Sequence, residues 1–265
     1  MAHRIRGDGP LLLLLAGTGY AGSTWPDELV DPLARHFTVV TMDYRGTGRT
    51  PGTADEYSTR LFAADARALL RTLGRGPAHV LGHSMGGRVA QWVALDEPDA
   101  VRRLVLAASG PGPIRADRPH YTGIPPATCL ALVEKGYERM IADQIRATFF
   151  TPEFAADAPA TVQWLVDAFW QDRPQLPEYL KHVCARQGHD TVARVGEIGQ
   201  PTLVLVGDRD THAGGTGSHL EQSRYLADHL PNADFQLVPG GAHGYFWSHP
   251  DLVVPRLVGF LGASA

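Results

Sequence analysis

The segment VLGHSMGG at residues 80–87 has the residue types and spacing of a serine nucleophile. Its centre is Gly82-x-Ser84-x-Gly86, preceded by a strand-like run and followed by a helix-like run. A nucleophile elbow requires this context, because its turn is so tight that the flanking residues must be small. The elbow lifts the serine hydroxyl clear of the sheet, and the helix start favours developing negative charge. The segment therefore predicts Ser84 as the nucleophile of a covalent reaction.

A serine hydroxyl is a weak nucleophile and needs a histidine base that is oriented by a carboxylate. In chains with such an elbow, the order is serine, then Asp or Glu, then histidine. The strand-like run TLVLVG is followed by Asp208 and Asp210, and the run FQLVPGGAHG contains His243. Both positions follow strands, and open α/β sheets place their sites at the carboxyl ends of strands. The pattern predicts His243 as the base and one of the two aspartates as its partner.

Strand-like and helix-like segments alternate through the first part of the chain. Buried strands are expected at 11–16, 37–43, 78–82, 103–108, 202–206 and 235–238. Helices are expected at 25–35 (capped by Ser23 or Thr24), 58–73, 86–96 and about 251–261. Between 112 and 196 only helical periodicity occurs. The pattern predicts an α/β fold with a mostly parallel sheet, formed by residues 1–111 and 197–265 and interrupted by a helical insertion at 112–196.

These motifs resemble the α/β-hydrolase-fold superfamily, and within it the cap-bearing group of carboxylesterases, enol-lactonases, C–C bond hydrolases and cofactor-free haloperoxidases. DYRGTGRT at 43–50 resembles the D-x-R-G-x-G-x-S loop of the family, and GHSMGG resembles its elbow. VGDRD resembles its G-x-x-D, and GGAHGYFWSHPDLV its histidine loop and final helix. The resemblance implies a triad of Ser84, Asp210 and His243, with Asp208 as the alternative acid. It also implies that the helical insertion is a cap.

The expected oxyanion hole follows from the same resemblance. It consists of two backbone amides, those of Met85 and Thr18, with Gly19 as the alternative to Thr18. The chain has Ala16-Gly17 where the family has His-Gly after its first buried strand. Because the donors are backbone groups, loss of that histidine need not remove the hole.

The segment GTGYAG at 17–22 also has the form of a dinucleotide-binding fingerprint, with Asp43 at the end of the next strand. In that motif the last glycine belongs to the following helix. Here Ser23, Thr24 and Pro26 indicate a helix that starts after the glycines. A dinucleotide site would also leave the serine, aspartate and histidine motifs unexplained, so no cofactor is expected. No metal is expected either, because the sequence has no HExxH pair.

Small and aromatic residues are expected to line a substrate pocket. Tyr20 and Trp25 lie closest in sequence to the elements that build the site. Aromatic residues of the insertion are further candidates, although a Trp or Phe at helical spacing is more often a core residue. The expected pocket residues are Gly17, Gly19, Tyr20, Trp25, Phe149, Trp164 and Trp170.

Three functions fit this site, and the leading one is hydrolysis of a carboxylic ester or lactone of a small apolar substrate through an acyl-enzyme. A second is haloperoxidase-like perhydrolysis, or a lyase or cyclase step in natural-product metabolism, with the same triad. A third is a ligand-binding receptor that retains the fold. Gly244 follows His243, where C–C bond hydrolases carry Trp, so that subgroup is disfavoured.

The composition of the chain disfavours nucleic acid and a membrane as partners, and a small-molecule substrate is the partner expected. Of 265 residues 44% are hydrophobic and the formal charge is −4, which disfavours nucleic acid. The aliphatic run Leu11–Leu15 is too short to span a bilayer, and residues 8–10 separate it from the basic residues before it. Two cysteines exclude a disulfide framework and a four-thiolate zinc site, and both Cys129 and Cys184 are expected to be buried. We expect a cytoplasmic protein without nucleic-acid or membrane partners, and a homodimer is left open.

Overall fold

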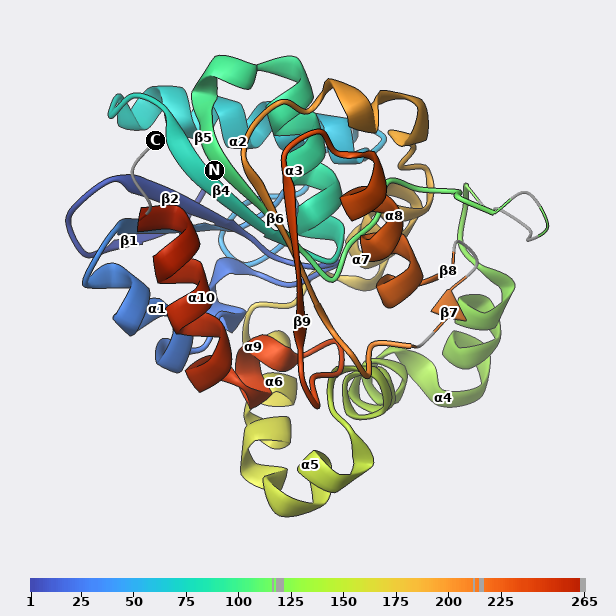
Figure 1. Ribbon diagram of the computed structural model, residues 1–265. Coiled ribbons are helices and arrows are strands. Elements are labelled where there is room, and N and C mark those ends of the chain that lie inside the picture. Colours follow the sequence, from blue (N-terminus) through green and yellow to red (C-terminus); the bar gives the residue numbers. More distant parts are fainter. Residues whose placement is uncertain (116, 118–121, 212, 215–216, 263–265) are drawn as a thin grey trace.

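A mostly parallel sheet forms the centre of the computed structural model, which describes residues 1–115, 117, 122–211, 213–214 and 217–262 (Figure 1). Its seven strands lie in the order β1-β3-β2-β4-β5-β6-β9. β1 pairs antiparallel with β3, and the other neighbours pair in parallel. The strands are β1 (His3–Arg6), β2 (Leu11–Leu15), β3 (Thr38–Met42), β4 (Ala78–His83), β5 (Val101–Ala107), β6 (Thr202–Gly207) and β9 (Ala233–Val238). The expected α/β architecture is confirmed.

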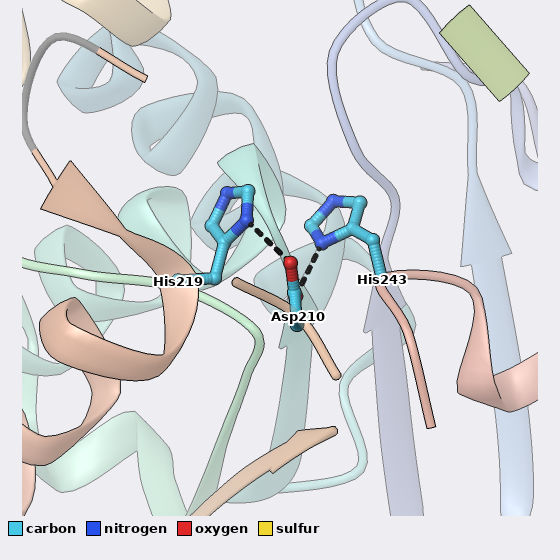
Figure 2. Close-up of side chains that lie close together, drawn as sticks. All are labelled: Asp210, His219 and His243. Carbon is cyan, nitrogen blue, oxygen red and sulfur yellow. Dashed lines mark hydrogen bonds and ion pairs between the residues drawn. The ribbon is translucent and has the colours of Figure 1, made fainter. Parts of the chain in front are cut away.

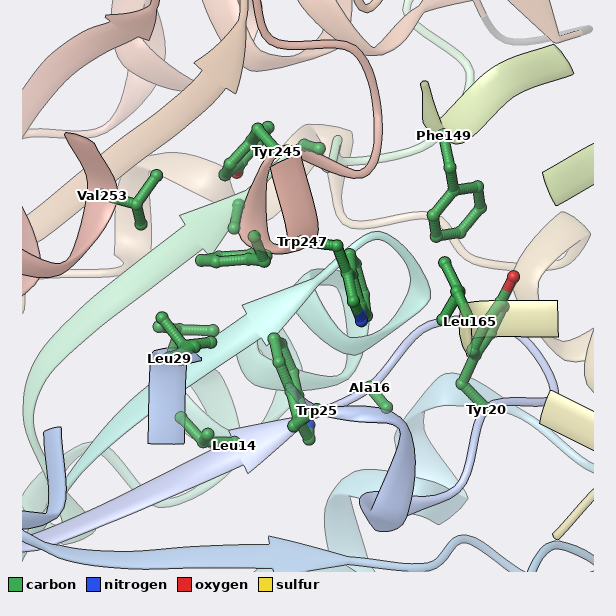
Figure 3. Packing of buried hydrophobic residues seen from close by; sticks show 14 of the residues in the cluster. Leu14, Ala16, Tyr20, Trp25, Leu29, Phe149, Leu165, Tyr245, Trp247 and Val253 are labelled. Carbon is green, nitrogen blue, oxygen red and sulfur yellow. The ribbon is translucent and has the colours of Figure 1, made fainter. Parts of the chain in front are cut away.

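Helices cover both faces of this sheet. Leu29 of α1 and Leu257 of α10 belong to one buried cluster, while Phe62 of α2, Val89 of α3 and Leu226 of α8 belong to the other. Figure 3 shows the first cluster, in which α1, α9 and α10 pack their apolar side chains beside β2. The core helices are α1 (Asp27–Ala34), α2 (Thr59–Leu73), α3 (Met85–Asp96), α8 (His219–His229), α9 (Tyr245–Ser248) and α10 (Pro250–Gly262).

A run of helices separates β5 from β6 in the chain. It comprises α4 (Pro126–Gln144), the π-helix η3 (Ile145–Phe149), α5 (Pro152–Asp157), α6 (Pro159–Gln171) and α7 (Leu176–Gln187). These helices fall within the predicted insertion, of which residues 116 and 118–121 lie outside the described part. A Cβ on Gly19 or on Gly46 would contact α7, at Tyr179 and Glu178 respectively. α7 therefore packs over the loops that follow β2 and β3, at the carboxyl edge of the sheet.

The remaining elements are short. The 3-10 helices are η1 (Gly22–Thr24), η2 (Pro98–Ala100) and η4 (Val192–Glu197), and a two-stranded hairpin pairs β7 (Ala213–Gly214) with β8 (Gly217–Ser218). No helix among the described residues is both long and apolar enough to span a membrane.

Three local expectations are wrong. Neither Ser23 nor Thr24 caps the first helix, because α1 begins after Pro26 and the Ser23 hydroxyl donates to Asp172 instead. Cys129 is exposed and Cys184 is only partly buried. The helical periodicity expected between 112 and 196 does not give one continuous buried face, since Gly136 breaks α4 with a φ of 75° and Leu130 and Val133 before it are exposed.

Candidate active site

Ser84 lies in a sharp turn between β4 and α3. Its φ of 57° and ψ of −118° match the first central position of a type II′ turn, which favours glycine. A Cβ on Gly82 would collide with the backbone of Gly86, and a Cβ on Gly86 would collide with the carbonyl of Leu15. The turn is therefore compatible only with glycine at these two positions, as the sequence motif predicted.

The end of β5 fixes this turn. The Ser84 N–H donates to the Ala107 carbonyl at 2.9 Å, and the Ser109 hydroxyl donates to the Ser84 carbonyl at 2.7 Å. Between them lies Ala108, also at positive φ, 46°. The hydrogen bonds hold the backbone of Ser84 while its side chain remains partly exposed.

Asp210 and His243 lie together at the ends of β6 and β9. Nδ1 of His243 donates to Oδ2 of Asp210 at 2.8 Å, and both side chains are buried (Figure 2). Asp208 faces elsewhere: its Oδ1 accepts the Gly240 N–H at 2.9 Å, and its side chain is 38% exposed. The geometry therefore selects Asp210 over Asp208 as the partner of His243. Because Nδ1 is the donor, the lone pair of the neutral ring lies on Nε2.

The environment keeps Asp210 ionised. Burial raises the pKa of its carboxyl group, but the charges and hydrogen bonds of His219 and His243 lower it more, so the pKa lies well below its usual range. A buried carboxylate with donors on both oxygens can hold the imidazole in one tautomer and stabilise its cation.

The backbone of His243 is tied to the helical insertion. The N–H groups of His243 and Gly244 donate to the carbonyls of Thr148 and Phe149, at 3.2 and 2.7 Å. A Cβ on Gly244 would lie 2.6 Å from the Phe149 carbonyl oxygen, which explains why a small residue follows the histidine. Nε2 of His83 donates to the His243 carbonyl at 2.9 Å, so the His83 side chain points away from Ser84.

Ser84 and His243 are connected through the packing of Gly17, Tyr20 and Phe149, but they do not form a hydrogen bond with each other. The nearest side-chain atom to a Cβ on Gly17 is Ser84 Cβ at 3.5 Å, followed by the ring of Tyr20 at 3.7 Å. Tyr20 stacks on Phe149 with 5.4 Å between ring centroids, and Phe149 lies 5.0 Å from the His243 ring. No hydrogen bond joins Ser84 Oγ to His243 Nε2 among the described residues. Catalytic contacts of this kind often tighten only when substrate binds.

The amides predicted for the oxyanion hole lie in two suitable turns. Tyr20 N–H donates to the Gly17 carbonyl at 3.2 Å, which closes a turn with Gly19 at a φ of 77°. Met85 is the first residue of α3, where an N–H has no partner within the helix. Within the described residues, no acceptor is found for the N–H of Thr18, Gly19 or Met85. Thr18 and Gly19 both remain candidates.

The predicted pocket residues divide into two sets. Gly17, Gly19, Tyr20 and Phe149 lie in or beside the loops just described. Trp25 is a core residue that stacks on Trp247 with 6.0 Å between ring centroids, and its ring lies 6.2 Å from that of His83. Trp164 is 43% exposed and shares a small cavity of about 150 Å³ with Trp25, while Trp170 packs on Tyr137 and Arg173. The structure thus places these three tryptophans in packing or surface positions.

His219 was missed by the sequence reasoning. Its Nδ1 donates to Oδ1 of Asp210 at 3.1 Å, and its ring stacks on His243 with 4.2 Å between centroids and 21° between planes (Figure 2). The sequence contained one signal for its position, the capping box Ser218-x-x-Glu221. This motif predicts the start of a helix shortly after Asp210, with His219 as its first residue.

Asp210, His219 and His243 also have residue types that bind metals. Their candidate ligand atoms lie within 4.8 Å of one another. However, each Nδ1 is at hydrogen-bond distance from a different oxygen of Asp210. These contacts fit two N–H donors on one carboxylate, and the carboxylate oxygens are already taken up by them.

Comparison with known proteins places the chain in a family. Residues 9–250 match the family described as alpha/beta hydrolase fold, and the chain belongs to that family. A protein of Pseudomonas syringae pv. syringae named as a carbamate hydrolase, RutD, is 32% identical over 239 residues, covering 89% of this chain and 87% of the relative.

Two solved structures are similar over nearly their whole length. The enol-lactonase from Burkholderia xenovorans LB400 superimposes with a TM-score of 0.81 at 23% identity, covering 99% of this chain and 96% of that one, and shows the shared fold. BpoC from Mycobacterium tuberculosis H37Rv, named as a non-heme bromoperoxidase, has a TM-score of 0.80 at 27% identity, covering 98% and 95%. The predicted resemblance to the α/β-hydrolase-fold superfamily is confirmed.

Proposed function

We propose that the protein is a serine hydrolase that cleaves a carboxylic ester or lactone of a small apolar substrate. The observation that carries the proposal is the pairing of buried, ionised Asp210 with His243 Nδ1, at the same sheet edge as the Ser84 elbow. This pairing leaves Nε2 as the basic atom of His243. The aromatic rings of Tyr20 and Phe149 beside the site favour an apolar acyl group.

In the proposed reaction His243 Nε2 takes the proton of Ser84 as Oγ attacks the carbonyl carbon. The N–H of Met85 and that of Thr18 or Gly19 stabilise the oxyanion, each contributing about 3–4 kcal/mol in the transition state. His243 then protonates the leaving alkoxide. The same base activates water, which releases the acid and restores the free serine.

The names of the relatives support the bond type. A carbamate hydrolase and an enol-lactonase are named for substrates in which a carbonyl carbon carries an oxygen or nitrogen leaving group. The likeness to BpoC supports the second candidate, in which hydrogen peroxide replaces water in the last step. That step transfers the acyl group to peroxide and gives a peracid, with the same serine ester as its precursor.

The test combines labelling with kinetics. A fluorophosphonate probe should label Ser84, and p-nitrophenyl esters of short acids should be hydrolysed. Ser84→Ala should abolish labelling and lower kcat by about 10⁴–10⁶. Asp210→Asn should lower kcat by about 10⁴, whereas the matched variant Asp208→Asn should stay close to the parent.

A parent protein that neither labels nor hydrolyses any ester, lactone or carbamate offered would refute the proposal. Equal losses in the two Asp→Asn variants would refute the assignment of Asp210. Measuring peracid and free acid with and without hydrogen peroxide separates the two candidate reactions.

A further inference from the structure

The carboxylate of Asp210 is shared between two imidazoles from different elements. Oδ2 accepts from His243 in the loop after β9, and Oδ1 accepts from His219 at the start of α8. Asp210 is 1% exposed, so an oxygen that lost its donor would be left buried and unsatisfied. Its two hydrogen bonds fix both the position and the rotation of the carboxylate group (Figure 2).

His219 is in its neutral form at neutral pH. Burial lowers the pKa of its imidazole, and this outweighs the opposing effect of Asp210. A neutral ring that donates from Nδ1 has its lone pair on Nε2, so the contact with Asp210 adds a donor without adding a positive charge. The side chain is 30% exposed, which leaves the ring in contact with both the carboxylate and solvent.

The charged and titratable groups around Asp210 and His219 come from five elements. From α9, the phenol of Tyr245 has its pKa raised by burial and by the charge of Asp210, so it is neutral. Asp210 and His243 contact His219 directly. From β4, His83 lies 4.7 Å from the His243 ring, and burial lowers the pKa of His83 well below its usual range, so this ring is neutral. From α3, the cation of Arg88 acts on His219 and disfavours its protonated form.

Resting on the proposed function, we propose that His219 is a positioning residue that holds Asp210 for His243. By donating to Oδ1, His219 fixes the buried carboxylate so that Oδ2 faces Nδ1 of His243. Without this donor the carboxylate could rotate, and the imidazole of His243 would lose its fixed orientation toward Ser84.

The test compares three variants. His219→Ala removes the donor, whereas His219→Asn keeps one, since the Asn amide nitrogen occupies the position of Nδ1. His229→Ala is the matched control, because His229 lies on the same helix and bonds to the Tyr225 carbonyl. Each variant is assayed for kcat and KM with a p-nitrophenyl ester as the probe substrate.

We expect His219→Ala to lower kcat about tenfold at unchanged KM, because Asp210 loses its orientation. His219→Asn should restore kcat, and His229→Ala should match the parent. An unchanged kcat in His219→Ala overturns the proposal, as does a rise in KM in place of the loss of kcat, or a loss that His219→Asn leaves uncorrected.

A second measurement does not need hydrolysis. In the resting protein, NMR should detect two hydrogen-bonded Nδ1 protons, one for each imidazole on Asp210. His219→Ala should remove one and shift the other, while His219→Asn should remove one and leave the other in place. An unshifted His243 proton in His219→Ala overturns the proposal even if no substrate is found. The expected NMR result in a protein that neither labels nor hydrolyses any ester, lactone or carbamate offered refutes only the proposed function.

Discussion

Substitutions at Ser84 can measure the backbone strain of the proposed site. A non-glycine residue at φ 57° and ψ −118° costs about 1–3 kcal/mol of folding free energy. Glycine at this position removes the strain but loses about 0.5–1 kcal/mol through the greater freedom of the unfolded chain. At the middle of both ranges we therefore expect Ser84→Gly to be more stable than Ser84→Ala by about 1 kcal/mol.

Comparing Gly with Ala isolates the backbone, because neither variant has a nucleophile or a hydroxyl. The free energy of unfolding in urea measures the difference, and thermal unfolding should show a rise of about 1–5 °C for the glycine variant. Both variants should be inactive toward esters. A Ser84→Ala protein as stable as Ser84→Gly would show that the turn is not strained, and would refute this reasoning.

Two further predictions concern the surroundings of the site. Burial lowers the pKa of His182 to about 4 in the folded protein, against 6.5 when unfolded, so stability present above pH 6.5 is lost as pH falls toward 4. The variant His182→Gln retains a donor to the Arg45 carbonyl but has no group that titrates in this range. Between pH 7 and pH 5 its free energy of unfolding, measured in urea, should fall by about 2 kcal/mol less than that of the parent. An equal fall in the two proteins would contradict the prediction. Gly244→Ala should lower the free energy of unfolding by about 1–3 kcal/mol, because the new Cβ would displace Phe149. Gly259→Ala is the control and should not lower it, since a Cβ there meets nothing within 4 Å. Equal values for the two variants would count against the close contact between Gly244 and Phe149.

The sequence was most informative where local chemistry decides the structure. The strands of the parallel sheet are buried on both faces, so their continuous apolar runs could be recognised without knowledge of the fold. The elbow was recognisable because only glycine fits at 82 and 86. The helix at Thr59–Leu73 was placed closely, since Ser58 caps it and Gly74 ends it in the left-handed region.

Elements whose stability depends on tertiary contacts were missed. β1 is exposed along most of its length and pairs antiparallel with β3, so its residues show no buried run. Trp25 looked like a pocket residue because of its position in the chain, yet it stacks on Trp247 from the far end of the sequence. The choice between Asp208 and Asp210 could not be made from spacing, because it depends on where the loop after β9 places its Gly240 amide and its histidine.

Departures from ordinary backbone and burial rules cluster at one edge of the sheet. Among the described residues, the non-glycine residues with positive φ are Ser84 and Ala108, which follow the neighbouring strands β4 and β5. The ionised carboxylate of Asp210 is buried one strand further on. Each feature destabilises the fold by itself, and each is held by contacts from other elements, such as the Ser109 hydroxyl on the Ser84 carbonyl. Backbone strain that is concentrated at one place and compensated by other elements is typical of functional sites. It favours a catalytic role for this edge of the sheet over a role in ligand binding alone.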